Sequence, residues 1–412
     1  MDSWGKNKKR KATDSWGKPK KKIAMDSDWE NLPKDLLDLV LERLESISDY
    51  LAFSVVCKTW NGVAKNNRSQ NRHTAPMLLI SSDKEDTWNL YNVINDKVLD
   101  LQLRLPSKRF CGFSKGWLIA LEENLVVTLM NPFSMVEGCK EKENSIIRLP
   151  PLASFYQFGE LDYHVYKATI SADPILNAHD FIVTVIYGHF SNFAVIRPGK
   201  DTDWSYINFN FEDDWEFQQF HEVVHLEDKF YAVYNKNRIL SFDARDTILC
   251  FDVMSELEIK WGSLTPKGGF GSHCHANKTY IVDSNEKGLL IVKRYKEWKG
   301  IWPDGKAVTF KFEIFELNFD KHELIEKETL DDAALFLGDN SSMFVLASKL
   351  LGCQPNCIYF TSDYQCSSWV PEDFGVYNIK TQSISKPYTT TAMTMLGRTK
   401  RPAIWVMPTC RQ

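Results

Sequence analysis

Two groups of residues in this chain have the chemistry of metal ligands. The first is His273-Cys274-His275, and the second is Cys353, Cys357 and Cys366. Imidazole and thiolate groups bind zinc, but zinc sites usually pair their cysteines at C-x-x-C spacing, which neither group has. Cys357 also falls within an apolar run, where a free cysteine normally serves as a small hydrophobic residue. The sequence therefore predicts no metal site and no cofactor.

Two acidic pairs are the remaining candidates for catalysis. Asp213-Asp214 and Asp331-Asp332 contain the type of carboxylate that a glycosidase uses. Because the side chains of adjacent residues point apart, these pairs are expected to be solvated turn or cap residues. The chain has no G-x-S-x-G, no Walker loop, no H-E-x-x-H and no dinucleotide fingerprint. We therefore expect a protein that is not an enzyme, with a hydrolase as the less favoured alternative.

The segment most suited to binding a partner lies at residues 29–64. Its apolar residues recur at the spacing of one helix face: Leu36, Leu37, Val40, Leu41 and Leu44. Asn31 is expected to cap this helix, and Pro33 to fall in its first turn. Ser48 and Asp49 offer a second start signal, so the segment predicts three short helices. A module of this size cannot bury a large core, and an apolar face that its own domain leaves uncovered needs a partner.

These residues also resemble an F-box. The matching series is Leu32-Pro33, Leu36-Leu37, Val40-Leu41, Leu44, Asp49, Leu51 and Val56-Cys57-Lys58-x-Trp60. It departs from the family at Val40, where isoleucine is commoner, and at Tyr50, where many members are polar. The resemblance implies that residues 27–70 dock a Skp-family adaptor and, through it, a cullin. The adaptor-binding residues that it implies are Leu32, Pro33, Leu36, Leu37, Val40, Leu41, Leu44, Val56, Cys57 and Trp60.

Charge divides the chain into a basic tail and an acidic body. The 412 residues carry a net charge of −4, whereas residues 1–24 carry +7, which leaves −11 for the remainder. This asymmetry argues against one extended nucleic-acid surface, so no specific nucleic-acid partner is expected. The chain has neither the run of about 20 apolar residues of a membrane span nor a secretory signal. Its nine scattered cysteines favour reduced thiols, and hence the nucleus and/or the cytoplasm.

The tail, residues 1–26, contains an internal repeat. Met1-Asp-Ser-Trp-Gly-Lys6 returns as Thr13-Asp-Ser-Trp-Gly-Lys18, and each copy is followed by a basic cluster. The clusters are Lys8, Lys9, Arg10 and Lys11, then Lys20, Lys21 and Lys22. So few apolar residues cannot offset the entropy of ordering, and we expect a disordered tail. The spacing suits a bipartite nuclear-import signal. There are two alternatives. The tail could be a solvated segment that no receptor recognises, or it could contact RNA or DNA phosphates non-specifically.

From about residue 75 to residue 400 the pattern becomes one of short strands. Apolar or alternating runs are separated by Gly, Asn, Asp and Pro, and their number suits a β-propeller of six or seven blades. The region resembles the F-box-associated, kelch-like propeller domain of a large plant family. The residues that carry the resemblance are Gly116-Trp117-Leu118, Asn131-Pro132-Phe133, Leu149-Pro150-Pro151, Phe230-Tyr231-Ala232-Val233, Leu335-Phe336-Leu337-Gly338 and Asn356-Cys357-Ile358-Tyr359-Phe360. The fold class expected is therefore a small all-α F-box followed by a large all-β domain.

Four tryptophans in polar surroundings are candidates for binding a target protein. They are Trp204, Trp215, Trp298 and Trp302. Aromatic side chains on loops concentrate binding energy, although these residues could equally pack beneath their own blades. The resemblance implies the substrate-recognition subunit of an SCF-type ubiquitin ligase, in which the propeller holds an unknown target for ubiquitination and degradation. A non-degradative scaffold or inhibitor is the alternative, and the sequence does not name the target.

Overall fold

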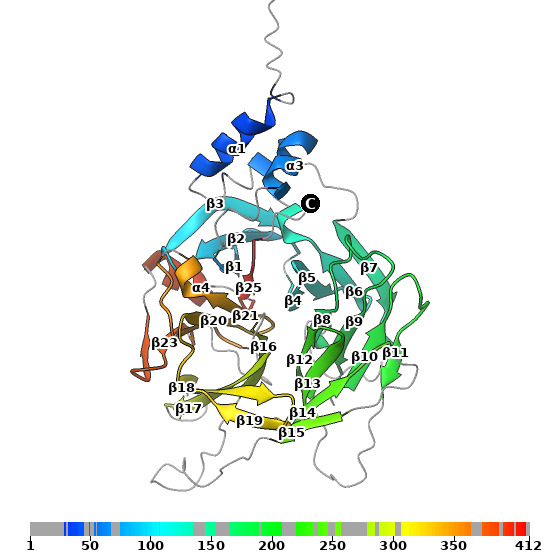
Figure 1. Cartoon of the computed structure of the whole chain (residues 1–412), viewed down its shortest axis with the longest axis vertical. Coiled ribbons are helices and arrows are strands. Elements are labelled where there is room, and N and C mark those ends of the chain that lie inside the picture. The colour runs from blue at the N-terminus through cyan, green and yellow to red at the C-terminus, as the bar shows by residue number, and fades with distance from the viewer. Residues whose placement is uncertain are drawn as a thin grey trace, which may run out of the picture.

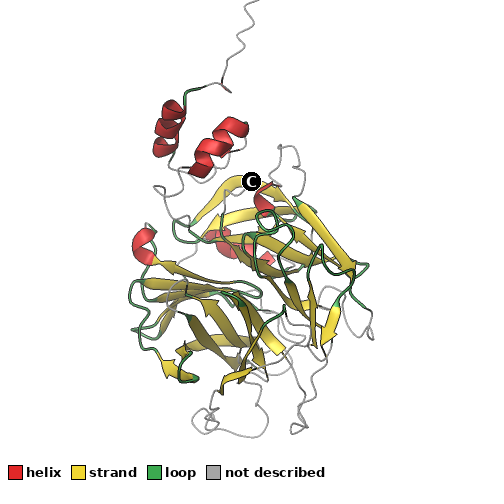
Figure 2. Ribbon diagram, turned by 45° about the vertical axis from the view of Figure 1, so that its right-hand side comes forward, coloured by secondary structure: helices red, strands yellow, loops and turns green. Residues whose placement is uncertain are grey.

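A computed structural model describes a helical module and a ring of β-sheets. The described residues are 29, 32–44, 49, 53–54, 56–66, 75–106, 108–134, 145–153, 165–188, 192–207, 220–234, 238–245, 252–256, 278–284, 288–300, 306–350, 352–363, 373–386, 390–398 and 401–408. Helices α1 (Lys34–Arg43) and α3 (Lys58–Asn66) form the helical module, which extends beyond the strands (Figure 2). None of the helices in these described ranges is long and apolar enough to cross a membrane.

Helix α1 starts two residues later than the expected cap at Asn31 implies. Pro33 is the N-cap residue, and its carbonyl oxygen accepts hydrogen bonds from the backbone N–H groups of Leu36 and Leu37 at 3.0 and 3.2 Å. The expected cap, Asn31, lies outside the described residues. Between α1 and α3, residues 49, 53 and 54 are helical, where the middle helix is predicted.

The strands that follow the helical module form six sheets, which are arranged in a ring as a β-propeller (Figure 1). Each sheet is one blade. Blade 1 contains β25 (Ile404–Val406), β1 (Met77–Ser81), β2 (Thr87–Asn92) and β3 (Lys97–Arg104). Blade 2 contains β4 (Phe110–Ser114), β5 (Trp117–Leu121), β6 (Val126–Met130) and β7 (Ile146–Pro151). Blade 3 contains β8 (Val165–Ile170), β9 (Val183–Tyr187), β10 (Asn192–Ile196) and β11 (Ser205–Ile207).

The second half of the ring follows the same plan until its last blade. Blade 4 contains β12 (Phe220–Leu226), β13 (Lys229–Tyr234), β14 (Arg238–Phe242) and β15 (Asp252–Glu256). Blade 5 contains β16 (Lys278–Asp283), β17 (Leu289–Lys299), β18 (Lys306–Asn318) and β19 (Glu323–Glu326). Blade 6 has five strands, β21 (Ser342–Leu346), β20 (Ala333–Leu337), β22 (Cys357–Phe360), β23 (Gly375–Asn378) and β24 (Ser383–Ser385), with β20 and β22 parallel. The sequence predicts six or seven blades, and the described residues form six.

The ring is closed by strands from the two ends of the propeller. Strand β25, near the C-terminus, pairs antiparallel with β1, so blade 1 contains chain from both ends. The innermost strands β25, β4, β8, β12, β16 and β21 line the axis. Helix α4 (Thr390–Arg398) connects blade 6 to β25 and buries Ala392 and Leu396 in the core between blades 6 and 1.

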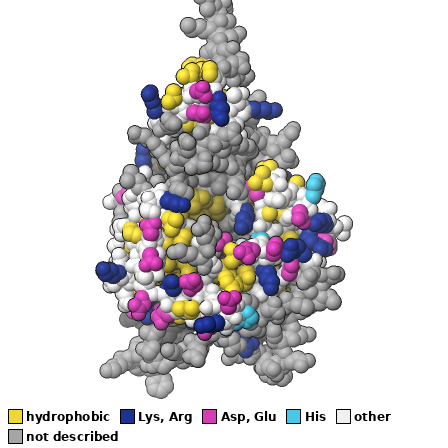
Figure 3. Space-filling view, viewed as in Figure 1, with side chains coloured by type: hydrophobic (Ala, Val, Ile, Leu, Met, Phe, Trp, Pro, Cys, Tyr) yellow, Lys and Arg dark blue, Asp and Glu magenta, His cyan; other side chains and the backbone are white. Residues whose placement is uncertain are grey.

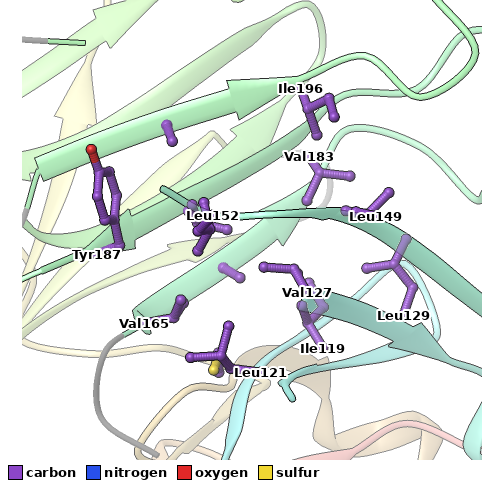
Figure 4. Packing of buried hydrophobic residues seen from close by; sticks show 14 of the residues in the cluster. Ile119, Leu121, Val127, Leu129, Leu149, Leu152, Val165, Val183, Tyr187 and Ile196 are labelled. Atoms are coloured by element: carbon purple, nitrogen blue, oxygen red, sulfur yellow. The ribbon is translucent and has the colours of Figure 1, made fainter. Parts of the chain in front are cut away.

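The hydrophobic core lies between the blades. Six clusters of buried side chains each join two neighbouring blades. Figure 4 shows the cluster between blades 2 and 3, where Ile119 and Val127 face Val183. Burying a side chain of this kind contributes about 1.5–3 kcal/mol, so the interfaces between blades carry most of the hydrophobic stabilisation.

One glycine is required where inner strands meet. A Cβ atom at Gly112 on β4 would lie 2.1 Å from the carbonyl oxygen of Ala168 on β8. Real Cβ atoms essentially never come closer than 3.0 Å to such an atom, so the backbones would have to separate to admit any side chain. Glycine therefore permits the close approach of blades 2 and 3 at the axis.

Candidate functional site

The helical module has a core of its own. Five side chains, Leu37, Leu41, Phe53, Val63 and Ala64, are buried together, with Leu32, Leu44 and Trp60 packed against them. These residues come only from the helical module, and they include the apolar stripe of α1 at positions 37, 41 and 44. The predicted helix is present and positions 37, 41 and 44 lie in the core of the module, but Leu36 and Val40, predicted on the same face, are exposed.

A second apolar stripe of α1 faces solvent. Leu36, Leu39 and Val40 are 48%, 50% and 39% exposed, and Val56 before α3 and Trp29 before α1 are 51% and 57% exposed. We call Leu36, Leu39 and Val40 the exposed apolar face; Trp29 and Val56 are exposed hydrophobic residues of the module outside α1. Figure 3 shows hydrophobic side chains on the outer surface of the module. Large hydrophobic side chains gathered on one small module mark a binding surface.

The ten predicted adaptor-binding residues divide between core and surface. Pro33, Leu36, Val40 and Val56 are exposed, whereas Leu32, Leu44, Cys57 and Trp60 are partly buried. Leu37 and Leu41 are 0% and 3% exposed, so they are core residues and their assignment to direct docking is corrected. The sequence reasoning missed Leu39 and Trp29. Leu39 had a signal, because it lies three positions after Leu36 and one helix turn places both on the same side.

A hydrogen bond joins the two ends of the module. The Nε1–H of Trp60 in α3 donates to the carbonyl oxygen of Trp29 at 2.7 Å. The ring of Trp60 packs on Phe53, with 4.6 Å between ring centroids and 42° between planes. Trp60 is thus fixed at its ring and at its N–H, and it holds the chain that precedes α1.

In the propeller, charged residues meet at the face where the inner strands begin, which we call the entry face. Lys167 on β8 and Glu222 on β12 form a buried ion pair at 2.5 Å. Arg109, just before β4, pairs with Asp339, just before β21, at 2.7 Å and is equally buried. Arg109 also donates to the carbonyl oxygens of Val165 and Tyr166. These bonds connect blades 2, 3, 4 and 6 across the axis.

The turn between β20 and β21 lies at the centre of the entry face. The Asn340 side chain donates to the carbonyl oxygen of Phe110 in blade 2, and Lys278 of blade 5 donates to the carbonyl oxygen of Asp339. The backbone N–H of Trp405 in blade 1 donates to the hydroxyl of Ser341. One turn from blade 6 thus bonds to three other blades, and its polar groups are buried.

An extensive network of buried charges joins blades 5 and 6. The fully buried guanidinium of Arg294 on β17 donates to Asp363 at 2.5 Å and to Asp373 at 3.0 Å. Its Nε–H donates to the hydroxyl of Thr309 at 2.7 Å. Burial alone would raise the pKa of the Asp363 carboxyl, but the charges of Arg294 and neighbouring lysines hold that pKa well below its usual range. Lys278, on the inner strand β16, lies 3.9 Å from Asp339 and 3.5 Å from Asp363, so it links the Arg294 network between blades 5 and 6 to the residues at the axis. We call the linked residues the axial charge cluster: Arg109, Lys167, Glu222, Lys278, Arg294, Asp339, Asp363 and Asp373.

The ion pairs of this cluster join different blades of the propeller. Its carboxylates accept hydrogen bonds or ion pairs from cations of other blades. A buried charge that is paired in this way resists removal of its partner, because the remaining charge would stay buried without compensation. The cluster therefore fixes the blades in register at the axis.

The candidate target-binding tryptophans have different outcomes. Trp204 is 4% exposed, and its Nε1–H donates to the carbonyl oxygen of Pro150 in blade 2 at 2.8 Å. It packs in the core between blades 2 and 3, so its assignment as a target anchor is wrong. Trp215, Trp302 and the side chain of Trp298 lie outside the described residues.

The residues with the chemistry of catalysis or metal binding are only partly described. His273, Cys274, His275, Cys366, Asp213 and Asp214 lie outside the described residues. Cys353 and Cys357 are buried, and burial raises the pKa of the Cys353 thiol to about 11 and also raises that of Cys357. Both thiols are protonated at neutral pH. Among the described residues, no group of three or more His, Cys, Asp or Glu is suited to hold a metal ion.

The pair Asp331-Asp332 is fully described and lies in a turn. Asp331 has a positive φ of 55°, which short polar residues tolerate in turns. Asp332 accepts hydrogen bonds from the backbone N–H and the hydroxyl of Ser348. The expected role as turn residues is confirmed for this pair.

Together these features define an F-box module joined to a six-bladed β-propeller, and comparisons with known proteins agree. The F-box domain family matches residues 29–71, and the KIB1-4 β-propeller family matches residues 90–378. The chain belongs to the KIB1-4 β-propeller family. The finer expectation of a kelch-like propeller is not confirmed, because the family that matches is a different one.

Relatives that match most of the chain are found in Arabidopsis thaliana. F-box protein SKIP23 is 24% identical over 396 residues, with 87% of this chain and 90% of that protein covered. F-box protein At2g17036 is 22% identical over 396 residues, with 87% and 91% covered. Among solved structures, the chain is similar to the β-propeller domain of Cps50 (Swd1) from Myceliophteria thermophila, with 12% sequence identity and a TM-score of 0.33. The match covers 77% of this chain and 86% of the Cps50 chain.

Proposed function

We propose that this protein is the substrate-recognition subunit of an SCF-type ubiquitin ligase. In this proposal the helical module docks a Skp-family adaptor, which links it to a cullin, and the propeller binds a target protein. The observation that carries the proposal is the exposed apolar face, because the module has already filled its own core and still presents Leu36, Leu39 and Val40 to solvent. The ubiquitin-transfer chemistry would be supplied by the ligase, and this chain would raise the effective concentration of the target.

The adaptor proposal is tested by affinity purification from plant cells. A Leu36→Asp/Leu39→Asp variant changes the surface of α1 and leaves Leu37 and Leu41 in the core. The proposal expects adaptor and cullin to be lost from this variant, while target proteins remain bound. A Leu176→Asp variant is the control, because Leu176 is 71% exposed on the propeller and lies outside the module. Absence of any adaptor from the wild-type eluate would refute the proposal.

The outcome for the target separates degradation from scaffolding. If the bound target accumulates when the proteasome is inhibited, the chain directs degradation. If target levels do not change while the target's activity falls on binding, the chain acts as an inhibitory scaffold. The axial charge cluster supports a rigid binding platform in either case, since it holds the blades in register at the entry face.

The entry face is the surface proposed to receive the target. Trp215 lies between β11 and β12, and Trp302 between β17 and β18. Strand β12 begins at the entry face, and β17 runs antiparallel to β16, so it ends where β16 begins. The strand ends that flank both tryptophans therefore lie on this one face. A Trp215→Ala/Trp302→Ala variant should retain the adaptor and lose the target.

The basic tail is proposed to be a nuclear-import signal, which would place the protein in the nucleus as well as the cytoplasm. The basis is the charge pattern of Lys8, Lys9, Arg10, Lys11, Lys20, Lys21 and Lys22. A fluorescent fusion that lacks residues 1–24 should lose its nuclear accumulation. Nuclear signal equal to that of the full chain would contradict the proposal.

A further inference from the structure

Trp29 combines a fixed backbone with an exposed side chain. Its carbonyl oxygen accepts the hydrogen bond from the Trp60 indole at 2.7 Å, across 31 residues of sequence. Its own side chain is 57% exposed, the largest exposed fraction among the large hydrophobic residues described in the helical module. The backbone of Trp29 is thus held by a hydrogen bond while more than half of the residue stays exposed.

Trp60 is suited to hold that backbone because it is itself immobilised. Its ring packs against Phe53, which is 4% exposed and belongs to the core of the module. Its N–H is then directed at the chain before α1 rather than at solvent. Ordering a residue before a partner arrives lowers the entropy cost of binding, which is how a positioning residue raises affinity without touching the partner.

We propose that Trp29 is a direct docking residue for the adaptor and that Trp60 is the positioning residue that presents it. This inference rests on the proposed function, in which the module binds a Skp-family adaptor. Tryptophan is the side chain most enriched among residues that dominate binding energy, and its amphipathic ring fits an apolar pocket with a polar rim. Trp29 therefore adds an exposed aromatic side chain in the segment before α1.

The inference changes the role of one residue of the F-box resemblance. Trp60 is expected there as an adaptor contact, but its ring is partly buried and its N–H is used within the module. Its effect on docking would pass through Trp29. This makes a specific prediction about coupling, because two residues that act through one contact give non-additive effects when both are changed.

The test is titration of the full chain with a purified Skp-family adaptor by isothermal titration calorimetry. Trp29→Ala should weaken binding about 10- to 100-fold, the range of a hot-spot residue. Trp60→Phe keeps an aromatic ring against Phe53 and removes only the N–H donor, and it should weaken binding about 3- to 10-fold, since a single neutral hydrogen bond contributes about 0.5–1.5 kcal/mol. The double variant should bind no more weakly than Trp29→Ala alone.

Three outcomes would overturn part or all of this account. Wild-type affinity in Trp29→Ala would remove Trp29 from the interface, while loss of binding in Leu36→Asp/Leu39→Asp would show that the proposed function still stands. Additive losses in the double variant would mean that Trp60 makes a contact of its own, against the positioning role. Failure of the wild-type chain to bind the adaptor would refute the proposed function and this inference with it. Circular dichroism of each variant, with Leu176→Ala as the matched control, excludes loss of folding as the cause.

Discussion

The helical module leaves apolar side chains exposed, whereas the propeller buries charged ones. In the described part of the module, Leu37 and Leu41 fill a small core, and Leu36 and Leu39 of the same helix are about half exposed. In the propeller, six hydrophobic clusters join the blades, and Arg294 is fully buried between two aspartates. A small module buries a small fraction of its surface, so it cannot bury both sides of its helices. A large ring buries a larger fraction, and its interior also contains ion pairs.

The difference separates the two roles. Contact between apolar side chains and water is unfavourable in free energy. A partner that buries these side chains removes this contact, and the change favours binding. Buried ion pairs contribute little net stability over apolar packing, but they fit only one geometry. In the proposed function the adaptor covers the exposed apolar face of the module, whereas the buried ion pairs hold the propeller in one geometry.

The largest expected effect is at the buried charges of the propeller. An Arg294→Leu substitution should lower the free energy of unfolding of the propeller by about 3–5 kcal/mol, because it leaves Asp363 and Asp373 buried without their main counter-charge. Urea unfolding followed by tryptophan fluorescence measures it. The control is Lys327→Ala, which removes a partly exposed pair with Glu316 at 2.9 Å and should change stability little. Equal effects in the two variants would mean that the cluster does not hold the blades.

The sequence reveals this propeller but not the cluster at its axis. Strands such as β9, Val-Thr-Val-Ile-Tyr, are recognisable because strand preference is local. Arg109 and Asp339 are 230 residues apart, and only ring closure brings them within 2.7 Å. The choice between six and seven blades likewise depends on closure of the ring, which the pattern of a single strand does not report.

The helical module shows the same limit at smaller scale. The leucine spacing predicts a helix where α1 lies, but it places residues 36, 37, 40, 41 and 44 on one face, of which the structure exposes Leu36 and Val40. Which of these side chains are buried depends on α3, which packs against Leu37 and Leu41. Trp204 fails for a related reason, because its neighbours in sequence are polar while the acceptor for its N–H, Pro150, lies in another blade.

Two adjacent leucines of α1 provide a sharper test within the module. Leu37→Ala should destabilise the module by about 2–5 kcal/mol, since it removes a side chain that is 0% exposed. Leu36→Ala should leave stability nearly unchanged and weaken adaptor binding. Hydrogen exchange of the peptides that cover α1 and α3 measures the first effect without interference from the propeller. Faster exchange in Leu36→Ala than in Leu37→Ala would reverse our assignment of the two faces.

Two glycines extend the comparison to the backbone. Gly112→Ala should destabilise the propeller by about 1–3 kcal/mol, because the new Cβ would meet the carbonyl oxygen of Ala168 at 2.1 Å. Gly62→Ala in α3 meets nothing within 4 Å and should stabilise the module by about 0.5–1 kcal/mol, the usual gain in a helix. Thermal unfolding of Gly112→Ala and hydrogen exchange of Gly62→Ala provide the two measurements. A neutral Gly112→Ala would show that β4 and β8 separate easily.

The smallest effect expected is the response of the propeller to acid. The folded pKa of Asp363 is held well below that of an unfolded aspartate, about 3.9, so the carboxylate stabilises the fold above that pH. As pH falls below about 4 the unfolded chain takes up a proton that the folded chain does not, and stability is lost. This group alone should lower the free energy of unfolding by about 1 kcal/mol between pH 5 and pH 3. In Asp363→Asn, which cannot titrate there, the pH dependence should be shallower even though the variant is less stable throughout. Parallel curves for the wild type and this variant would show that Asp363 is not the group responsible.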